Sequence, residues 1–245
     1  MDTPPLIHRL LYREPGKNAM ARATLGFCGV RPVRAIAFGS VRGASSPQRQ
    51  AWLLGVAPVA PEAVIAVLGV MAVLAIGYTL PPLMFSYRGL GELDVAVTHS
   101  IGVLLCGFVF LGGGWRDPLP WLLSLPLLLA ILPSITLSGI PDLEADAAVG
   151  KRTLAVRLGH RGALTVALVF TLLATACALA WSLTGLAASA YGGIALVVVP
   201  HGAWLAWLLT RHLQSDRPPG RIDGLMAVSL GYVLWFGLWP LFRLA

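Results

Sequence analysis

The chain has 245 residues, a net charge of +7, and a composition that is 57% hydrophobic and only 12% charged. Soluble domains carry about 45–50% apolar and about 25% charged residues, so this composition excludes a water-soluble globule and a largely disordered chain. The basic residues lie between long apolar windows, where they set orientation in a membrane, and we expect no nucleic-acid partner.

Residues 1–58 precede the first apolar window and are rich in arginine. Positive charge at this position conflicts with the orientation that the later loops favour. We therefore expect residues 1–58 to be poorly ordered, interfacial or not the native start of the architecture, and residues 59–245 to form a transmembrane domain.

Six apolar windows follow, each close to the roughly 20 residues that a helix needs to cross about 30 Å of hydrocarbon. Continuous apolar runs favour helices over alternating strands. Prolines inside the third window would kink it and shape a cavity. The sequence predicts an all-α, polytopic transmembrane helix bundle of about six spans, at residues 61–80, 95–114, 118–137, 163–184, 188–210 and 224–241.

The connecting loops alternate in charge along the chain. Loops 81–94, 138–162 and 211–223 hold most of the basic residues, namely Arg88, Lys151, Arg152, Arg157, Arg161, Arg211, Arg217 and Arg221. The opposite ends hold Arg116 and Arg243. Because basic loops stay in the cytoplasm, we place these three loops there. We expect an integral, multi-pass protein of the bacterial inner (plasma) membrane.

Two carboxylates stand four residues apart in the second basic loop. On a helix, Asp142 and Asp146 would lie on one face, one turn apart. We expect that helix to include Pro141 in its first turn and to be capped by Ser138, with Glu144 pointing away. The alternative is a solvated helix cap whose charges only fix topology.

The chemistry of this loop favours magnesium. Mg²⁺ prefers oxygen ligands, and it commonly takes one or two carboxylates together with substrate phosphates. Lys151, Arg152 and Arg157 follow closely and offer positive charge to phosphate oxygens.

The string "IPDLEADAAVGKRTLAVRLG" at residues 140–159 resembles the second aspartate-rich motif of the UbiA superfamily of intramembrane prenyltransferases. The stretch from Tyr78 to Glu92, with its "YRGLGE" core, resembles the preceding loop of that family. This core is most similar to the menaquinone-type members, which prenylate 1,4-dihydroxy-2-naphthoate. The resemblance covers residues 60–245.

The resemblance implies nine transmembrane helices around a cavity open to the membrane, of which the six spans here would be the last six. This is the C-terminal two thirds of the fold. The first aspartate-rich motif, N/D-x-x-x-D-x-x-x-D, does not occur in residues 1–60, where Asp2 and Glu14 are the acidic residues. We expect three helices and half of the metal site to be missing from this chain.

The resemblance also assigns roles to individual residues. Asp142 and Asp146 would hold Mg²⁺ and so be catalytic, Arg88 and Lys151 would contact the diphosphate, and the ring of Tyr78 would stabilise a carbocation. Tyr78 could instead be an interfacial tyrosine, and Arg88 a charge that only sets topology. The implied reaction is the Mg²⁺-dependent transfer of a prenyl group from a prenyl (allylic) diphosphate to an aromatic acceptor in menaquinone- or ubiquinone-type quinone biosynthesis.

Three other functions are alternatives to prenyl transfer. The first is a catalytically incomplete UbiA-like membrane protein that binds lipid or a partner. A transporter is disfavoured because no repeat relates the two halves. An alcohol phosphotransferase is disfavoured because its Asp-Gly-x-x-Ala-Arg element is absent.

Histidines inside the apolar windows are a further signal, since ionisable residues at membrane depth are often functional. His201 lies in the middle of the fifth window, where we expect a neutral ring that is hydrogen-bonded across helices. His99 and Thr98 lie near the cytoplasmic end of the second window, where we expect them to line a cavity.

Overall fold

The computed structural model describes residues 61–110, 113–215 and 222–244, which form helices joined by short connections. The long helices are α4 (Pro61–Gly77), α8 (Pro118–Ser138), α10 (Leu154–Thr184), α12 (Ala195–Gln214) and α13 (Asp223–Leu244). Another continuous helical segment combines α6 (Gly91–Val97), the π-helical turn η3 (Thr98–Gly102) and α7 (Val103–Phe110). The short helices are α5 (Phe85–Arg88), α9 (Leu143–Ala148) and α11 (Ala188–Tyr191). The all-α prediction is confirmed, while residues 1–58, Arg217 and Arg221 lie outside the described residues.

Five of the six predicted spans correspond to one helical segment each, with shifted ends. Three helical segments are long and apolar enough to cross a membrane: Gly91–Phe110, Pro118–Ser138 and Leu154–Thr184. The predicted fifth window, 188–210, is wrong as a single helix. The chain forms α11, turns at Gly192 and Gly193, and then begins α12. Gly193 adopts a φ of 78°, which a continuing helix cannot contain.

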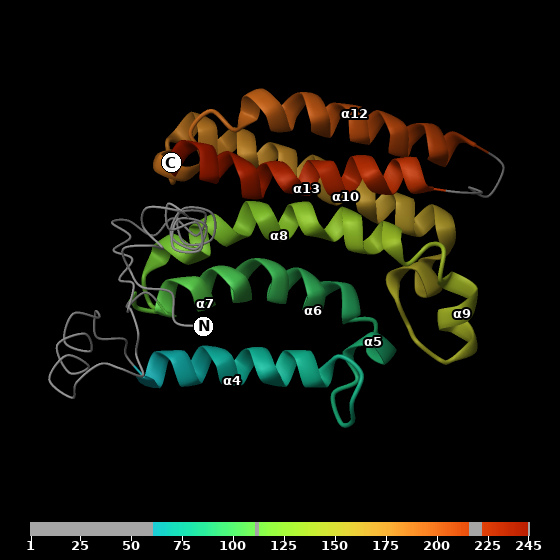
Figure 1. Ribbon diagram of the computed structural model, residues 1–245. Coiled ribbons are helices and arrows are strands. Elements are labelled where there is room, and N and C mark those ends of the chain that lie inside the picture. The colour runs from blue at the N-terminus through green and yellow to red at the C-terminus, as the bar shows by residue number, and fades with distance from the viewer. Residues whose placement is uncertain (1–60, 111–112, 216–221, 245) are drawn as a thin grey trace, which may run out of the picture.

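The central helix of the bundle is α8. It packs against α10 and α13 on one side and against α6, η3 and α7 on the other. Helix α12 packs against α10 and α13, and α4 lies at the edge against α7 and η3. Figure 1 shows this order, with α12 at the top and α4 at the bottom.

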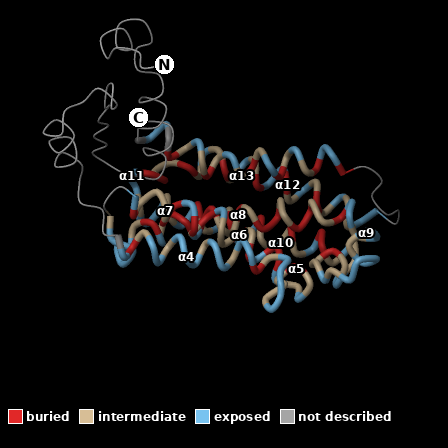
Figure 2. The backbone as a smooth tube through the Cα atoms, turned by 60° about the horizontal axis from the view of Figure 1, so that its bottom comes forward, coloured by how far each residue is buried: buried red, intermediate tan, exposed pale blue. Residues whose placement is uncertain are grey.

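Small residues bring the central helices close together. A stripe along α10 is fully buried and consists of Ala163, Ala167, Thr171, Ala174 and Ala178. These side chains leave room for the neighbouring backbone, which is how helices pack in membranes, where burial of apolar surface supplies little driving force. Figure 2 shows buried residues along the inner sides of the helices, whereas α4 is mostly exposed.

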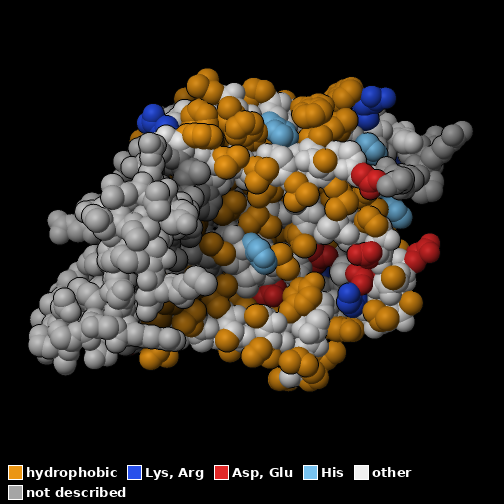
Figure 3. All heavy atoms as spheres, in the orientation of Figure 1, with side chains coloured by type: hydrophobic (Ala, Val, Ile, Leu, Met, Phe, Trp, Pro, Cys, Tyr) orange, Lys and Arg blue, Asp and Glu red, His pale blue; other side chains and the backbone are white. Residues whose placement is uncertain are grey.

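The outer surface divides into apolar sides and a polar end. Large apolar side chains are exposed on α4, α10 and α12, including Ile65, Leu172 and Leu196. Exposure on this scale suits contact with lipid rather than with water. In Figure 3, the acidic side chains gather towards the end that carries α9.

The three basic loops lie at the same end of the bundle. Successive long helices run in opposite directions, so the C-terminal ends of α4, α8 and α12 lie at one end of the bundle, on the right of Figure 1. The alternation of charge in the sequence therefore matches the alternation of helix direction. Which side of the membrane this end faces stays a prediction.

Candidate active site

Two loops at the polar end are joined by backbone atoms. The Arg152 amide, in the loop before α10, donates to the Ser86 carbonyl of α5 over 3.0 Å. Ser86 is fully buried, and its amide and hydroxyl both donate to the Tyr78 carbonyl, over 3.0 and 2.8 Å. This pair of loops contains the two segments that the sequence analysis singled out.

A glycine allows the close approach of these loops. Gly89 ends α5 with a φ of 78°, in the left-handed region that glycine adopts freely. A Cβ at this position would lie 3.0 Å from Arg157 Cδ and 3.1 Å from the Arg152 carbonyl oxygen. The first glycine of "YRGLGE" is thus required by both its conformation and its neighbours.

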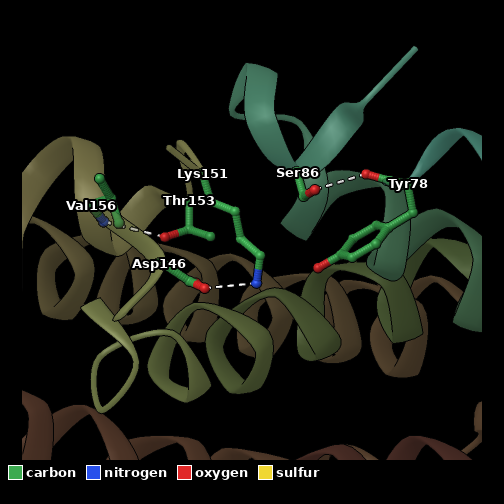
Figure 4. Close-up of polar contacts among 6 residues, drawn as sticks. All are labelled: Tyr78, Ser86, Asp146, Lys151, Thr153 and Val156. Carbon is green, nitrogen blue, oxygen red and sulfur yellow. Dashed lines mark hydrogen bonds and ion pairs between the residues drawn. The ribbon is translucent and has the colours of Figure 1, made fainter. Parts of the chain in front are cut away.

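The structure brings three of the predicted residues together. Lys151 Nζ lies 2.7 Å from Asp146 Oδ1, and the two side chains are 31% and 13% exposed. The Tyr78 hydroxyl points towards this pair in Figure 4. Tyr78 comes from the end of α4, Asp146 from α9 and Lys151 from the following loop.

The electrostatics of this cluster keep Lys151 and Tyr78 protonated at neutral pH. The hydrogen bond to Asp146 raises the pKa of Lys151, against the smaller opposing effect of burial. Burial raises the pKa of the Tyr78 hydroxyl, nearby Lys151 lowers it, and the carboxylates Glu92, Asp146 and Asp94 raise it further. The cluster therefore presents an ammonium group and a neutral phenol beside Asp146.

Asp142 takes a different position from Asp146. It is exposed and stands immediately before α9, where its carbonyl accepts from the Asp146 amide over 2.8 Å. The expected separation of one helical turn is present. The expected cap is wrong, because the chain turns at residues 139–142 before α9 begins. Ser138 still belongs to α8 and donates to the Ile135 carbonyl, and Pro141 precedes the helix.

Arg88 is not drawn into the cluster. Its exposed guanidinium donates to the Pro82 carbonyl over 2.8 Å. Among the described residues no ion pair joins it to Asp142 or Asp146. Its role as a diphosphate contact stays a prediction.

The sequence analysis assigned no role to Glu92 and did not single out Asp94. Glu92 is 5% exposed, and its Oε1 accepts from the Leu154 amide at the start of α10 over 2.7 Å. Asp94 is also buried. In the described part of the chain, Glu92 Oε2 and Asp94 Oδ1 have no hydrogen-bond partner. The sequence does contain a signal for them, because two acidic residues at the start of an apolar window are unusual.

An apolar cavity of about 450 Å³ lies between α6, η3, α7, α8 and α13. It reaches Ser138 at the polar end of α8, four residues before Asp142. His99 lines it, as expected, whereas Thr98 does not and instead donates to the Asp94 carbonyl. The volume and lining suit a lipid-like or aromatic molecule.

The expectation for His201 is confirmed. The Trp235 indole donates to His201 Nδ1 over 2.8 Å, so His201 Nε2 carries the proton that is donated to the Val228 carbonyl at 2.9 Å. Both ring nitrogens are used, and the imidazole is neutral. His201 is a packing residue that joins α12 to α13.

The side-chain oxygens at the polar end are the type of ligand that magnesium prefers. Asp142 and Asp146 provide carboxylate oxygens, and Asp142 is exposed to an incoming ligand. Among the described residues, no group of three or more His, Cys, Asp or Glu side chains could hold a metal ion. Two carboxylates fit an ion that takes its remaining ligands from water and substrate phosphates.

Comparison with known proteins adds independent information. The sequence model of the UbiA prenyltransferase family matches residues 31–241. The chain is 32% identical over 155 residues to 1,4-dihydroxy-2-naphthoate octaprenyltransferase of Bacillus subtilis (strain 168), covering 62% of this chain and 44% of that protein. It is 32% identical over 87 residues to UbiA prenyltransferase domain-containing protein 1 of Dictyostelium discoideum, covering 35% and 26%.

The chain spans less than half the length of both curated relatives. No solved structure is significantly similar to it. Apolar helices of spanning length and the family match together make the chain an integral membrane protein.

Proposed function

The chain belongs to the UbiA prenyltransferase family, and from this membership we propose that it transfers a prenyl group from an allylic diphosphate to an aromatic acceptor. The observation that carries the proposal is the cluster of Asp146, Lys151 and Tyr78 at the polar end of the bundle, together with an apolar cavity that extends to Ser138 at the same end. The polar cluster can bind the charged diphosphate, and the apolar cavity can bind the prenyl chain and the acceptor ring.

Prenyl transfer requires the allylic carbon–oxygen bond to break, with the electron pair leaving on the diphosphate. Positive charge fixed beside the leaving group stabilises this step. Lys151 is protonated and lies where it can exchange its contact with Asp146 for one with a diphosphate oxygen. Arg88 is a second candidate contact, after release from the Pro82 carbonyl.

The allylic cation left behind must be protected from water. The lining of the cavity is almost entirely aliphatic, which excludes water until the aromatic ring reacts. Tyr78 lies beside Lys151 and Asp146, and in this proposal its ring face stabilises the cation.

Asp142 and Asp146 are the residues that would hold Mg²⁺. When bound, the ion neutralises negative charge on the leaving diphosphate. Magnesium dependence is part of this proposal and is tested below.

The substrate class follows from the B. subtilis relative, whose name specifies 1,4-dihydroxy-2-naphthoate as acceptor. We propose an aromatic acceptor of this kind and a role in quinone biosynthesis of the menaquinone type. A bacterial inner membrane, with the polar end in the cytoplasm, is the location that fits both the substrates and the basic loops.

The test uses the full chain in lipid nanodiscs with Mg²⁺, a radiolabelled allylic diphosphate and 1,4-dihydroxy-2-naphthoate. We expect prenylated product, loss of activity with EDTA, and at least a roughly 100-fold lower rate for Asp146→Asn. Glu144→Gln is the matched control, because Glu144 is an exposed carboxylate of the same short helix. Its rate should stay within about twofold of the unmodified protein.

The alternative function is a UbiA-like protein that binds lipid without transferring it. Absence of product with every acceptor, together with retained binding of the allylic diphosphate, would establish that alternative. Equal rates for Asp146→Asn and Glu144→Gln would remove the carboxylate from the mechanism.

A further inference from the structure

His99 lines the cavity and is paired at one ring nitrogen with its own helical segment. Its Nδ1 lies 2.9 Å from the Val95 carbonyl, one turn earlier, and 3.1 Å from the Thr98 hydroxyl, which donates its own proton to the Asp94 carbonyl. Because a carbonyl oxygen only accepts, the neutral form of the ring carries its proton on Nδ1 and offers Nε2 as an acceptor. Among the described residues, Nε2 has no hydrogen-bond partner.

The π-helical turn η3 determines where this ring points. In an α-helix, two residues that are four positions apart in the sequence differ by about 40° in direction around the helix axis. Val95 and Val103, which are eight positions apart, would therefore differ by about 80°. The wider turn at Thr98–Gly102 reduces this drift, and Val95, His99 and Val103 all line the cavity. Such turns are frequent at functional sites.

The same helix face leads to the proposed reaction centre. Gly91 stands one turn before Val95, and a Cβ at Gly91 would lie 3.4 Å from the Tyr78 ring. This side of the helical segment thus runs from Gly91 beside the Tyr78 ring to Val95 and His99, which line the cavity.

The other polar groups of the cavity are already engaged. Ser134 shares a hydrogen bond of 2.8 Å with Ser229, and Ser138 donates to its own helix. The remaining lining residues are aliphatic, apart from a glycine and Met226. The serine oxygens can still accept a hydrogen bond, but they are not bases. Among the described residues that line the cavity, His99 Nε2 is therefore the group that can take up a proton from an entering hydroxyl.

We propose that His99 Nε2 accepts a hydrogen bond from a ring hydroxyl of the aromatic acceptor and takes its proton during prenyl transfer. This inference rests on the proposed function. The hydroxyl O–H bond breaks and its proton moves to Nε2, while the ring carbon forms the new bond to the allylic carbon. The electron pair of the broken carbon–oxygen bond leaves with the diphosphate. In 1,4-dihydroxy-2-naphthoate the ring carbon then loses its carboxylate as CO₂, the electron pair of that bond restores the aromatic ring, and the imidazolium returns its proton to the ring oxygen.

A buried carboxylate stabilises the product of this proton transfer. Asp94 lies in the same helical segment, is buried, and interacts electrostatically with His99. Its Oδ1 has no partner in the described part of the chain. A carboxylate beside the ring favours the imidazolium that forms when Nε2 gains a proton.

The test compares His99→Gln with His212→Gln in nanodiscs. Glutamine retains a hydrogen-bonding group but does not take up a proton. His212 is the matched control because its Nδ1 makes the same contact to the Leu208 carbonyl four residues earlier, at 2.8 Å, and it does not line the cavity. Three quantities are measured: prenylated product, diphosphate released without acceptor, and the dissociation constant of 1,4-dihydroxy-2-naphthoate.

We expect His99→Gln to reduce kcat for product at least about 100-fold, with diphosphate release and the dissociation constant changed by less than about threefold. His212→Gln should match the unmodified protein. With a mono-methyl ether of the acceptor that lacks the reacting hydroxyl, the effect of His99→Gln should disappear. A purely structural role would lower the rate with both acceptors.

A product rate for His99→Gln within about threefold of the unmodified protein would overturn the inference and leave the proposed function intact. Absence of product from the unmodified protein would overturn the proposed function itself. Where His99→Gln melts well below the unmodified protein, the shape-conserving His99→Phe is measured instead. It should fold, lose product formation, and bind the acceptor at least about fivefold more weakly.

Discussion

Glu92 links two helices that are far apart in the chain. Its carboxylate accepts from the amide of Leu154, which is one of the N-terminal amides of α10 that have no partner within the helix. Negative charge at a helix N-terminus is also favoured by the helix dipole. The acidic residue of "YRGLGE" is thus explained by the start of α10, 62 residues later.

Replacing Glu92 should destabilise the fold. Glu92→Ala leaves the Leu154 amide without its acceptor in a partly buried site, at a cost of about 1–3 kcal/mol. Glu92→Gln keeps an acceptor oxygen and should cost less. Thermal unfolding in detergent measures both, with the exposed Glu144→Ala as control. A melting temperature for Glu92→Ala equal to that of the control would contradict this role.

The two intramembrane histidines show what sequence alone leaves open. His99 and His201 both interrupt apolar windows, and their residue type gives no distinction. Their hydrogen-bond partners distinguish them. His201 is bonded to Trp235 and Val228 through its two ring nitrogens, whereas His99 is bonded through Nδ1 alone. Trp235 lies 34 residues from His201, so this contact depends on tertiary packing.

At the scale of one element, α10 is a helix with a sharp internal irregularity. Gly159 has a φ of 69° and a ψ of −179°, far from helical values. This region of backbone conformation is essentially restricted to glycine. The residues before Gly159 belong to the polar end, and those after it form the apolar span that the sequence predicted from residue 163.

Gly159→Ala should destabilise the protein through the backbone alone. A Cβ at Gly159 meets no atom within 4 Å, so steric contact adds nothing to the conformational cost of about 1–3 kcal/mol. Gly69→Ala is the matched control, because Gly69 also has open space but lies within the regular helix α4. The control should be neutral or slightly stabilising. Equal melting temperatures for the two variants would show that α10 straightens without cost.

The loops of the site were harder to predict than the helices. Apolar windows identify spans because lipid requires continuous apolar surface. Five of the six correspond to one helical segment each, whereas the window at 188–210 contains α11, a turn and most of α12. The turn at residues 139–142 could not be predicted, because the Asp142–Asp146 spacing fits a helix that starts on either side of Pro141. The pairing of Lys151 with Asp146 and the helix cap by Glu92 depend on contacts between loops, which no local pattern encodes.

At the scale of the whole molecule, the six long helices place every basic loop at one end. This arrangement predicts a topology that labelling can test. With Cys28, Cys106 and Cys177 replaced by serine, single cysteines at Glu144 and Ser215 should react with a membrane-impermeant thiol reagent from the cytoplasmic side. Cysteines at Asp117 and Leu186 should react from the opposite side. Labelling of positions 144 and 215 from different sides would contradict the antiparallel order of the helices.

The link between the two loops of the site has a consequence for how such a chain can diverge. It is made by the Arg152 amide and the Ser86 carbonyl, so it does not depend on the identity of either side chain. Any residue except proline can stand at position 152 and preserve it. Natural variation can therefore alter the charge and shape of these two loops while the separation between them stays constant.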